Sequence, residues 1–110
     1  MTKLLSIVIH ANAQVTENQR TWVEQLSNLD PELEVKSINT SGNWISFKAG
    51  LRTWSEITPQ NIRPRIQHVN QRIRGLMDAS HLFQGATLFT YQQDLNVKVT
   101  IPIVITCMIA

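Results

Sequence analysis

The sequence predicts an α+β fold in which two amphipathic helices pack on one face of a mostly antiparallel sheet. Short segments that are apolar, or that alternate between apolar and polar residues, are typical of strands. They are interleaved with two longer segments whose apolar residues recur every three to four positions, as on one face of a helix. The resulting order, β-α-β-β-α-β-β, matches the split βαβ or ferredoxin-like plan with a strand added at the C-terminal end.

The composition is that of an ordinary globular protein, with 110 residues, 43% hydrophobic and 16% charged. We expect one α+β domain spanning residues 1–110, because a chain of this length can bury a core without disulfides. The lone cysteine, Cys107, cannot form an intrachain disulfide, which favours a cytoplasmic location. Together with three scattered histidines it gives no zinc-binding spacing, so we expect no metal and no cofactor.

The first element, residues 3–9, is a nearly continuous apolar run rich in Ile and Val. It predicts a central strand buried on both faces. The run also resembles a signal peptide, but its apolar core of about six residues is shorter than the usual ~7–15, so we do not expect secretion. The apolar run at residues 101–110 is too short to cross a membrane, which takes ~20 residues. We therefore expect no membrane partner.

The second element is a predicted helix from Thr16 to Leu29. Thr16 and Gln19 have the spacing of a capping box. Four apolar residues then follow at helical spacing: Trp22, Val23, Leu26 and Leu29. Asp30 and Pro31 end the helix, because proline cannot continue the hydrogen-bond ladder.

Residues 32–39 and 44–49 are predicted to form a β-hairpin around the turn residues 40–43. In the second strand of this hairpin, Ile45, Phe47 and Ala49 share one face, and Trp44, Ser46 and Lys48 share the other. A shift of one residue in register would exchange the buried and exposed faces. The sequence therefore leaves both orientations of this strand open.

The segment 59–80 predicts the second amphipathic helix. Its apolar face consists of Ile62, Ile66, Val69, Ile73, Leu76 and Met77. Pro64 would interrupt a helix that began at Pro59. We therefore expect a single turn at residues 59–62 and a regular helix from near Pro64 to about Ala79.

Arginines flank this apolar face, and the segment holds four Arg and one Asp. The arginine stems could pack beside the apolar face with their charged groups in water. Alternatively, the side chains could contact the phosphates and sugars of nucleic acid, as could Gln67, Asn70 and Gln71. The candidate nucleic-acid-binding residues are Arg63, Arg65, His68, Arg72 and Arg74. Strand aromatics that could stack on RNA bases are Trp44, Phe47, Phe89 and Tyr91. The glycine-and-aromatic signature of an RNA-recognition motif is missing.

Residues 86–91 and 97–105 predict the last two strands. Pro102 lacks an amide hydrogen, which places it at a sheet edge or a bulge. The chain then ends in apolar residues, so we expect this strand either to be central in its sheet or to be covered by a second copy or another partner. The candidate interface residues are Ile101, Ile103, Ile105, Met108 and Ile109.

The sequence contains no nucleophile motif, glycine-rich phosphate loop, His–Glu metal pair or paired CxxC. His10, with Asn12, ends the first strand and is the one enzymatic candidate. A general base needs an orienting partner, and the sequence supplies distant ones: Asp30, Asp78, His68 and His81. We assign no catalytic residue.

These observations predict a small non-catalytic protein-binding module of the inhibitor, immunity or accessory-subunit type. We expect it to form homo-oligomers through its apolar C-terminal strand, so that its partner is another protein or a second copy of itself. The first alternative is an RNA- or DNA-binding regulator that uses the arginine-flanked helix 63–79. The second is a small enzyme that uses His10.

Overall fold

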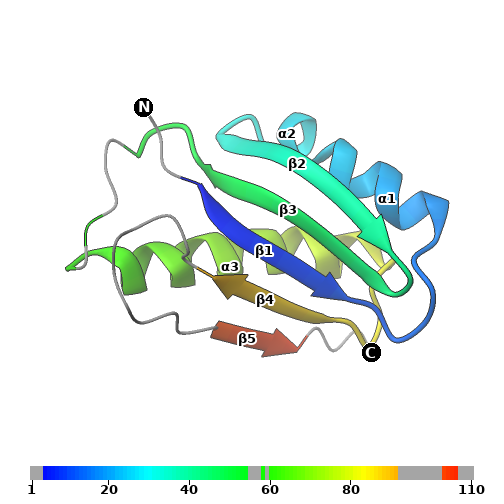
Figure 1. The fold of residues 1–110 in the computed structure, drawn as a ribbon. Helices are drawn as coiled ribbons and strands as arrows, with labels where there is room; N and C mark the ends of the chain where they lie inside the picture. Colours follow the sequence, from blue (N-terminus) through cyan, green and yellow to red (C-terminus); the bar gives the residue numbers. More distant parts are fainter. Residues whose placement is uncertain (1–3, 55–57, 59, 92–102, 107–110) are drawn as a thin grey trace.

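The computed structural model describes residues 4–54, 58, 60–91 and 103–106. The strands are β1 (Leu5–His10), β2 (Leu33–Ser41), β3 (Trp44–Leu51), β4 (Thr87–Tyr91) and β5 (Ile103–Thr106). The helices are α1 (Glu17–Glu24), α2 (Leu26–Leu29) and α3 (Ile62–Ser80). Within the described residues the strands form one antiparallel sheet in the order β2-β3-β1-β4-β5, with the helices on one side of it (Figure 1). The predicted α+β class is confirmed.

The first predicted helix is in fact two helices. Its start is the predicted capping box, in which Thr16 Oγ1 accepts from the Gln19 amide at 3.1 Å and Gln19 Oε1 accepts from the Thr16 amide at 2.9 Å. The interruption lies at Gln25, whose amide donates to the carbonyls of both Thr21 and Trp22, at 3.0 and 3.1 Å. Such sharing tightens the turn and breaks the regular ladder, so the prediction of one continuous helix was wrong.

Helix α3 begins at Ile62, slightly earlier than the predicted start near Pro64. Pro64 falls in the first helical turn, where a backbone amide has no acceptor within the helix, so it does not interrupt the ladder. The helix ends at Ser80, and the capping residue His81 adopts a left-handed conformation with φ of 57°. Pro59, part of the predicted single turn, lies outside the described residues.

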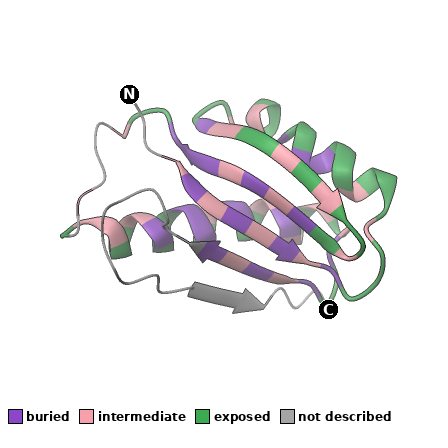
Figure 2. Cartoon of the chain, viewed as in Figure 1, coloured by how far each residue is buried: buried purple, intermediate pink, exposed green. Residues whose placement is uncertain are grey.

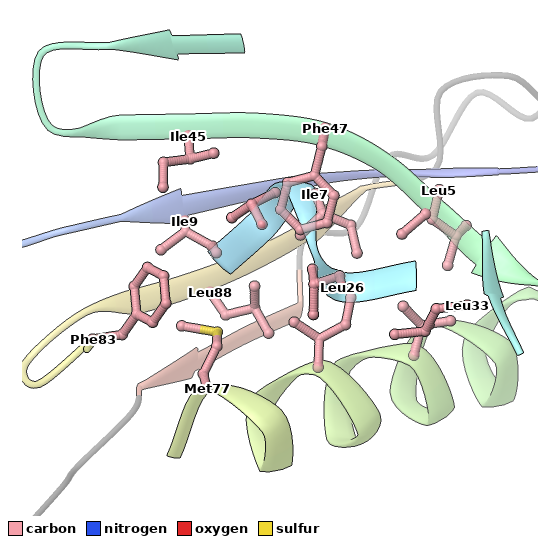
Figure 3. Close-up of a cluster of buried hydrophobic side chains, with 14 of the residues drawn as sticks. Leu5, Ile7, Ile9, Leu26, Leu33, Ile45, Phe47, Met77, Phe83 and Leu88 are labelled. Atoms are coloured by element: carbon pink, nitrogen blue, oxygen red, sulfur yellow. The ribbon is translucent and has the colours of Figure 1, made fainter. Parts of the chain in front are cut away.

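The core lies between the helices and one face of the sheet (Figure 3). Alternate strand residues are buried there, including Ile7, Ile9, Ile45, Phe47 and Leu88. From the helices come Val23 and Leu26 and the predicted apolar face of α3, of which Ile66, Val69, Ile73 and Met77 are buried. Phe47 is therefore a core residue and Trp44 faces the opposite side, which resolves the alternative that the sequence left open.

Strand β1 is central, as predicted, because β3 and β4 pair with its two edges. The prediction that it is buried on both faces was wrong. Ser6, Val8 and His10 are only half-buried, and they alternate with fully buried residues along the strand (Figure 2). The reason is that the described helices cover one face of the sheet only.

The strands at the two edges of the sheet differ. The register between β2 and β3 shifts between Lys36 and Asn39, and Ser37 has a positive φ of 58°. Leu33 and Val35 face the core, but the next apolar residue is Ile38, so one extra residue is needed to bring Ile38 to the core side. At the other edge, β5 pairs with β4 in a regular register over residues 103–106. Residues 97–102 of the predicted last strand lie outside the described residues.

Candidate functional site

The side of the sheet that faces away from the helices, here called the open face, carries alternate residues of four strands. By register these are Lys36 and Asn39 of β2, Trp44, Ser46 and Lys48 of β3, Ser6, Val8 and His10 of β1, and Thr87 and Phe89 of β4. None of these residues is fully buried. The described helices lie on the other side, so no described helix covers the open face (Figure 2).

Three aromatic side chains from adjacent strands meet on the open face. The rings of His10 and Trp44 are stacked, with centroids 4.2 Å apart and planes 8° from parallel. The rings of Trp44 and Phe89 are 6.3 Å apart and tilted by 34°. Trp44 remains 43% exposed, which is unusual for a side chain of its size and apolar area. About two-fifths of its surface is therefore accessible to a ligand.

A hollow of about 300 Å³ with both polar and apolar lining lies further along the same strands. Its polar lining residues are Ser6, Ser37, Asn39, Ser46 and Lys48, and its apolar ones are Ile7, Val8 and Phe47. The Lys48 ammonium donates to Ser6 Oγ at 2.7 Å. Hydroxyl, amide and ammonium groups of this kind bind polar and anionic ligands. The open face thus carries aromatic rings with hydroxyl, amide and ammonium groups beside them.

His10 has an amide partner rather than a carboxylate partner. Asn43 Nδ2 lies 2.8 Å from His10 Nε2, and the imidazole also stacks on Trp44. Of the distant candidates that could orient a general base, Asp30 pairs with Arg72 and Asp78 with Arg74. An amide fixes the ring but does not stabilise an imidazolium as a carboxylate does, so the described contacts give the enzymatic hypothesis no support.

The flanking arginines of α3 are largely engaged with the protein itself. Arg72 forms a two-pronged ion pair with Asp30, in which Nη2 donates to Oδ1 at 2.9 Å. This hydrogen-bonded pair lowers the pKa of Asp30 and raises that of Arg72. Arg65 lies over the Trp54 ring, 5.0 Å from its centroid. The structure therefore favours packed arginine stems over a continuous cationic surface.

The remaining members of the nucleic-acid candidate set are dispersed. Arg74 pairs with Asp78 at 3.8 Å, and both side chains are exposed. Among the described residues, Arg63 and His68 are exposed and form no hydrogen bond, ion pair or ring contact. The suggestion that Asn70 contacts a phosphate or sugar was wrong. Asn70 is completely buried on the side of α3 that faces the sheet, where its Oδ1 accepts from the Thr90 hydroxyl.

Two of the predicted interface residues, Ile103 and Ile105, belong to β5 at the edge of the described sheet. They pair with Thr90 and Leu88 of β4. Ile101, Met108 and Ile109 lie outside the described residues. Among the strands that the structure describes, β5 has a neighbour on one side only.

The rest of the described molecule offers no second site of defined chemistry. A hollow of about 510 Å³ beside α1 is lined by the exposed polar side of that helix, where Arg20 and Glu24 pair with each other at 3.7 Å. No group of three His, Cys, Asp or Glu side chains that could hold a metal ion occurs in residues 4–54, 58, 60–91 and 103–106. Neither observation points to a defined chemistry.

Sequence reasoning identified most of the open-face aromatics singly but not as one group. The alternation in β3 already placed Trp44, Ser46 and Lys48 together. What was missing was the pairing of β1 with β3 and β4, which brings His10 and Phe89 to Trp44. No helix in the described part of the chain has the length and apolar character needed to span a bilayer. Comparisons with models of protein families, with curated proteins and with solved structures found no match to this chain.

Proposed function

We propose that this chain is a non-catalytic protein-binding module that self-associates through the edge of β5. The observation that supports the proposal is the difference between the two edge strands. A strand at the edge of a sheet presents unpaired backbone amides and carbonyls, and natural proteins protect such edges with bulges, charges or covering elements. One edge of this sheet has these features and the other, over its described residues, has none.

Strand β2 is the protected edge. It carries the bulge around Ser37, and the Lys36 ammonium and the Glu34 carboxylate form an ion pair at 3.0 Å within it. A bulge twists the edge away from a partner strand, and charged side chains resist burial between two chains. We therefore expect β2 not to recruit another strand.

The described residues of β5 carry no such protection. Its residues 103–106 read Ile-Val-Ile-Thr, with no charge, no proline and a regular register against β4. Antiparallel pairing of β5 with its counterpart in a second copy would join the two sheets about a two-fold axis, an arrangement that closes at the dimer. A contact along a single short strand buries less than the ~1,600 Å² of a standard interface. The association is therefore expected to depend on protein concentration.

The same proposal includes the finer features of the fold. The sheet order β2-β3-β1-β4 with an additional strand beside β4 supports the split βαβ, ferredoxin-like plan with an added C-terminal strand. Because this plan hosts many unrelated functions, it does not by itself identify the partner. An inhibitor, immunity or accessory subunit in the cytoplasm is the role that we propose.

The test uses proline substitutions on neighbouring residues of each edge. Amides of successive residues in a strand point to opposite sides, so either Val104→Pro or Ile105→Pro removes an outward donor and the other removes a donor to β4. We expect one of the two variants to remain folded by circular dichroism and to be monomeric by light scattering, whereas the wild type forms dimers as its concentration rises.

The matched control is the same pair of substitutions in β2, Glu34→Pro and Val35→Pro. The folded member of this pair should retain the dimeric mass. A wild-type protein that stays monomeric at every concentration would refute the proposal. So would a folded β5 proline variant with undiminished mass.

A further inference from the structure

We propose that the open face binds single-stranded nucleic acid, with bases stacking on the aromatic rings of His10, Trp44 and Phe89. The site is on the sheet rather than on the arginine-flanked helix. It does not depend on the edge of β5, so it is independent of the self-association proposed above. Three kinds of observation support it: the geometry of the rings, the chemistry of the groups around them and the charge of the surface.

The rings form an ordered platform. His10 and Trp44 are already stacked at 4.2 Å, close to the spacing of stacked aromatic systems, and Trp44 contacts Phe89 as well. The hydrogen bond from Asn43 to the His10 imidazole fixes one member of the stack. Every base has a flat π-face, so a preformed aromatic surface can bind bases with little dependence on sequence.

The groups beside the rings suit a sugar–phosphate backbone. The hollow along β1 and β3 offers the hydroxyls of Ser6 and Ser46, the Asn39 amide and the Lys48 ammonium. Most hydrogen bonds to a nucleic acid come from such side chains and go to phosphate and sugar. A strand whose bases stack on Trp44 could place its backbone over this hollow.

The charge of the face favours a polyanion over a second copy of the chain. Its described cations are Lys36 and Lys48, and the nearby carboxylate of Glu34 is paired with Lys36. Two such faces pressed together would take the lysines, their carboxylate partner and the hydroxyls out of water, which costs free energy. A nucleic acid would instead neutralise the lysines and release counterions.

The preference for single strands follows from the same geometry. In a duplex the base faces are stacked on one another and only the base edges are accessible. A stacking platform therefore requires unpaired bases. The arginines of α3 are a poor alternative, because Arg72, Arg74 and Arg65 are held by Asp30, Asp78 and Trp54 respectively.

The experiment is fluorescence anisotropy of labelled oligouridine, with oligodeoxythymidine and a duplex of the same length as comparisons, at low and moderate salt. We expect Trp44→Ala to weaken binding by about 5- to 150-fold, the range that corresponds to losing one base–aromatic stack. Trp44→Phe should retain most of the affinity. Lys48→Gln should weaken binding and reduce the salt dependence by about one counterion.

Two exposed positions away from the open face supply matched controls. Leu29→Ala truncates another exposed apolar side chain, and Arg63→Gln removes one positive charge from α3. Both should leave the affinity unchanged. If Trp44→Ala fails to fold, the contrast between Lys48→Gln and Arg63→Gln decides between the sheet and the helix.

Several results would overturn the inference. They are no binding of the wild type at low salt, equal binding of duplex and single strand, and unchanged affinity of a folded Trp44→Ala protein. An equal loss for Arg63→Gln and Lys48→Gln would mean non-specific attraction by charge, and a loss for Arg63→Gln alone would place the contacts on α3. A fall in the mass of the Trp44→Ala protein, without loss of nucleic-acid binding, would assign the open face to a second copy of the chain.

Discussion

Strands β2 and β5 are the two edges of the described sheet, but only β2 has features that protect an exposed edge. Strand β2 interrupts its own pairing with a bulge and carries charged residues, whereas the described part of β5 is short, apolar and regular. The contrast teaches that the protection of an edge is specified by local sequence, because the two strands belong to the same sheet and differ in their residues and in the bulge. Strand β2 can therefore serve as a control for β5 within the same molecule when self-association is tested.

The largest effect is expected when the protection of β2 is removed. Deleting Ser37 restores one-to-one pairing with β3, because Ile38 then continues the alternation of Leu33 and Val35. Combined with Lys36→Val, the deletion leaves an edge without the bulge and without the lysine. We predict that this variant forms assemblies larger than dimers, since each chain then has two edge strands that can pair with another chain.

Sedimentation velocity measures this outcome directly. Lys36→Val alone, which keeps the bulge, is the control and should retain the wild-type distribution of masses. A deletion variant that remains folded and shows no larger species would mean that the bulge does not protect β2.

An intermediate effect is expected at the start of β2, where the pair between Asp30 and Arg72 ties the loop before the strand to α3. Asp30→Ala should lower the free energy of unfolding by about 1–2 kcal/mol, since a hydrogen bond to a charged group is lost. The loss is limited because Arg72 is one-third exposed and Glu32 stays within 3.5 Å of it. Urea denaturation measures this difference.

The same pair predicts a pH dependence. The pKa of Asp30 is lowered in the folded state by its hydrogen bonds from Arg72. Its contribution is therefore complete above the unfolded value of about 3.9 and is lost as the pH falls through the lower folded value. The stability difference between wild type and Asp30→Ala should disappear in that acidic range. A difference that persists at lower pH would show that the effect is not electrostatic.

The smallest effect is expected at Ser37 itself. Its φ of 58° is unfavourable for a residue with a Cβ atom and is easily adopted by glycine. Ser37→Gly should therefore raise the free energy of unfolding by up to about 1 kcal/mol and leave the oligomeric state unchanged. Ser41→Gly, in the same strand but without a positive φ, should instead be neutral or destabilising.

Local patterns in the sequence predicted much of this fold. The alternation in β3, the capping box at Thr16 and the apolar face of α3 all depend on residues close in sequence. The bulge also left a signal, because the core residues Val35 and Ile38 are separated by three positions instead of two. The interruption between α1 and α2 at Gln25 also involves only residues close in sequence, although no single residue type there predicts it.

What the sequence could not predict depends on contacts between distant segments. Asp30 and Arg72 are 42 residues apart, so the sequence did not predict the ion pair between them. The grouping of His10, Trp44 and Phe89 requires the pairing of three strands from separate parts of the chain. The burial of Asn70 likewise depends on Thr90 lying beneath α3. The open face was the least accessible to sequence reasoning, because it combines residues of four strands. Self-association through the C-terminal strand, in contrast, was already suggested by the local sequence and stays a proposal.

Hydrogen exchange of the edge amides, followed by NMR at several protein concentrations, tests the central proposal most directly. In a monomer, every second amide of an edge strand faces solvent and exchanges rapidly. Self-association through β5 predicts that all amides of residues 103–106 are protected and that this protection grows with concentration, whereas outward amides of β2 exchange rapidly throughout. Alternate amides of β5 that exchange as fast as those of β2 at every concentration would contradict it.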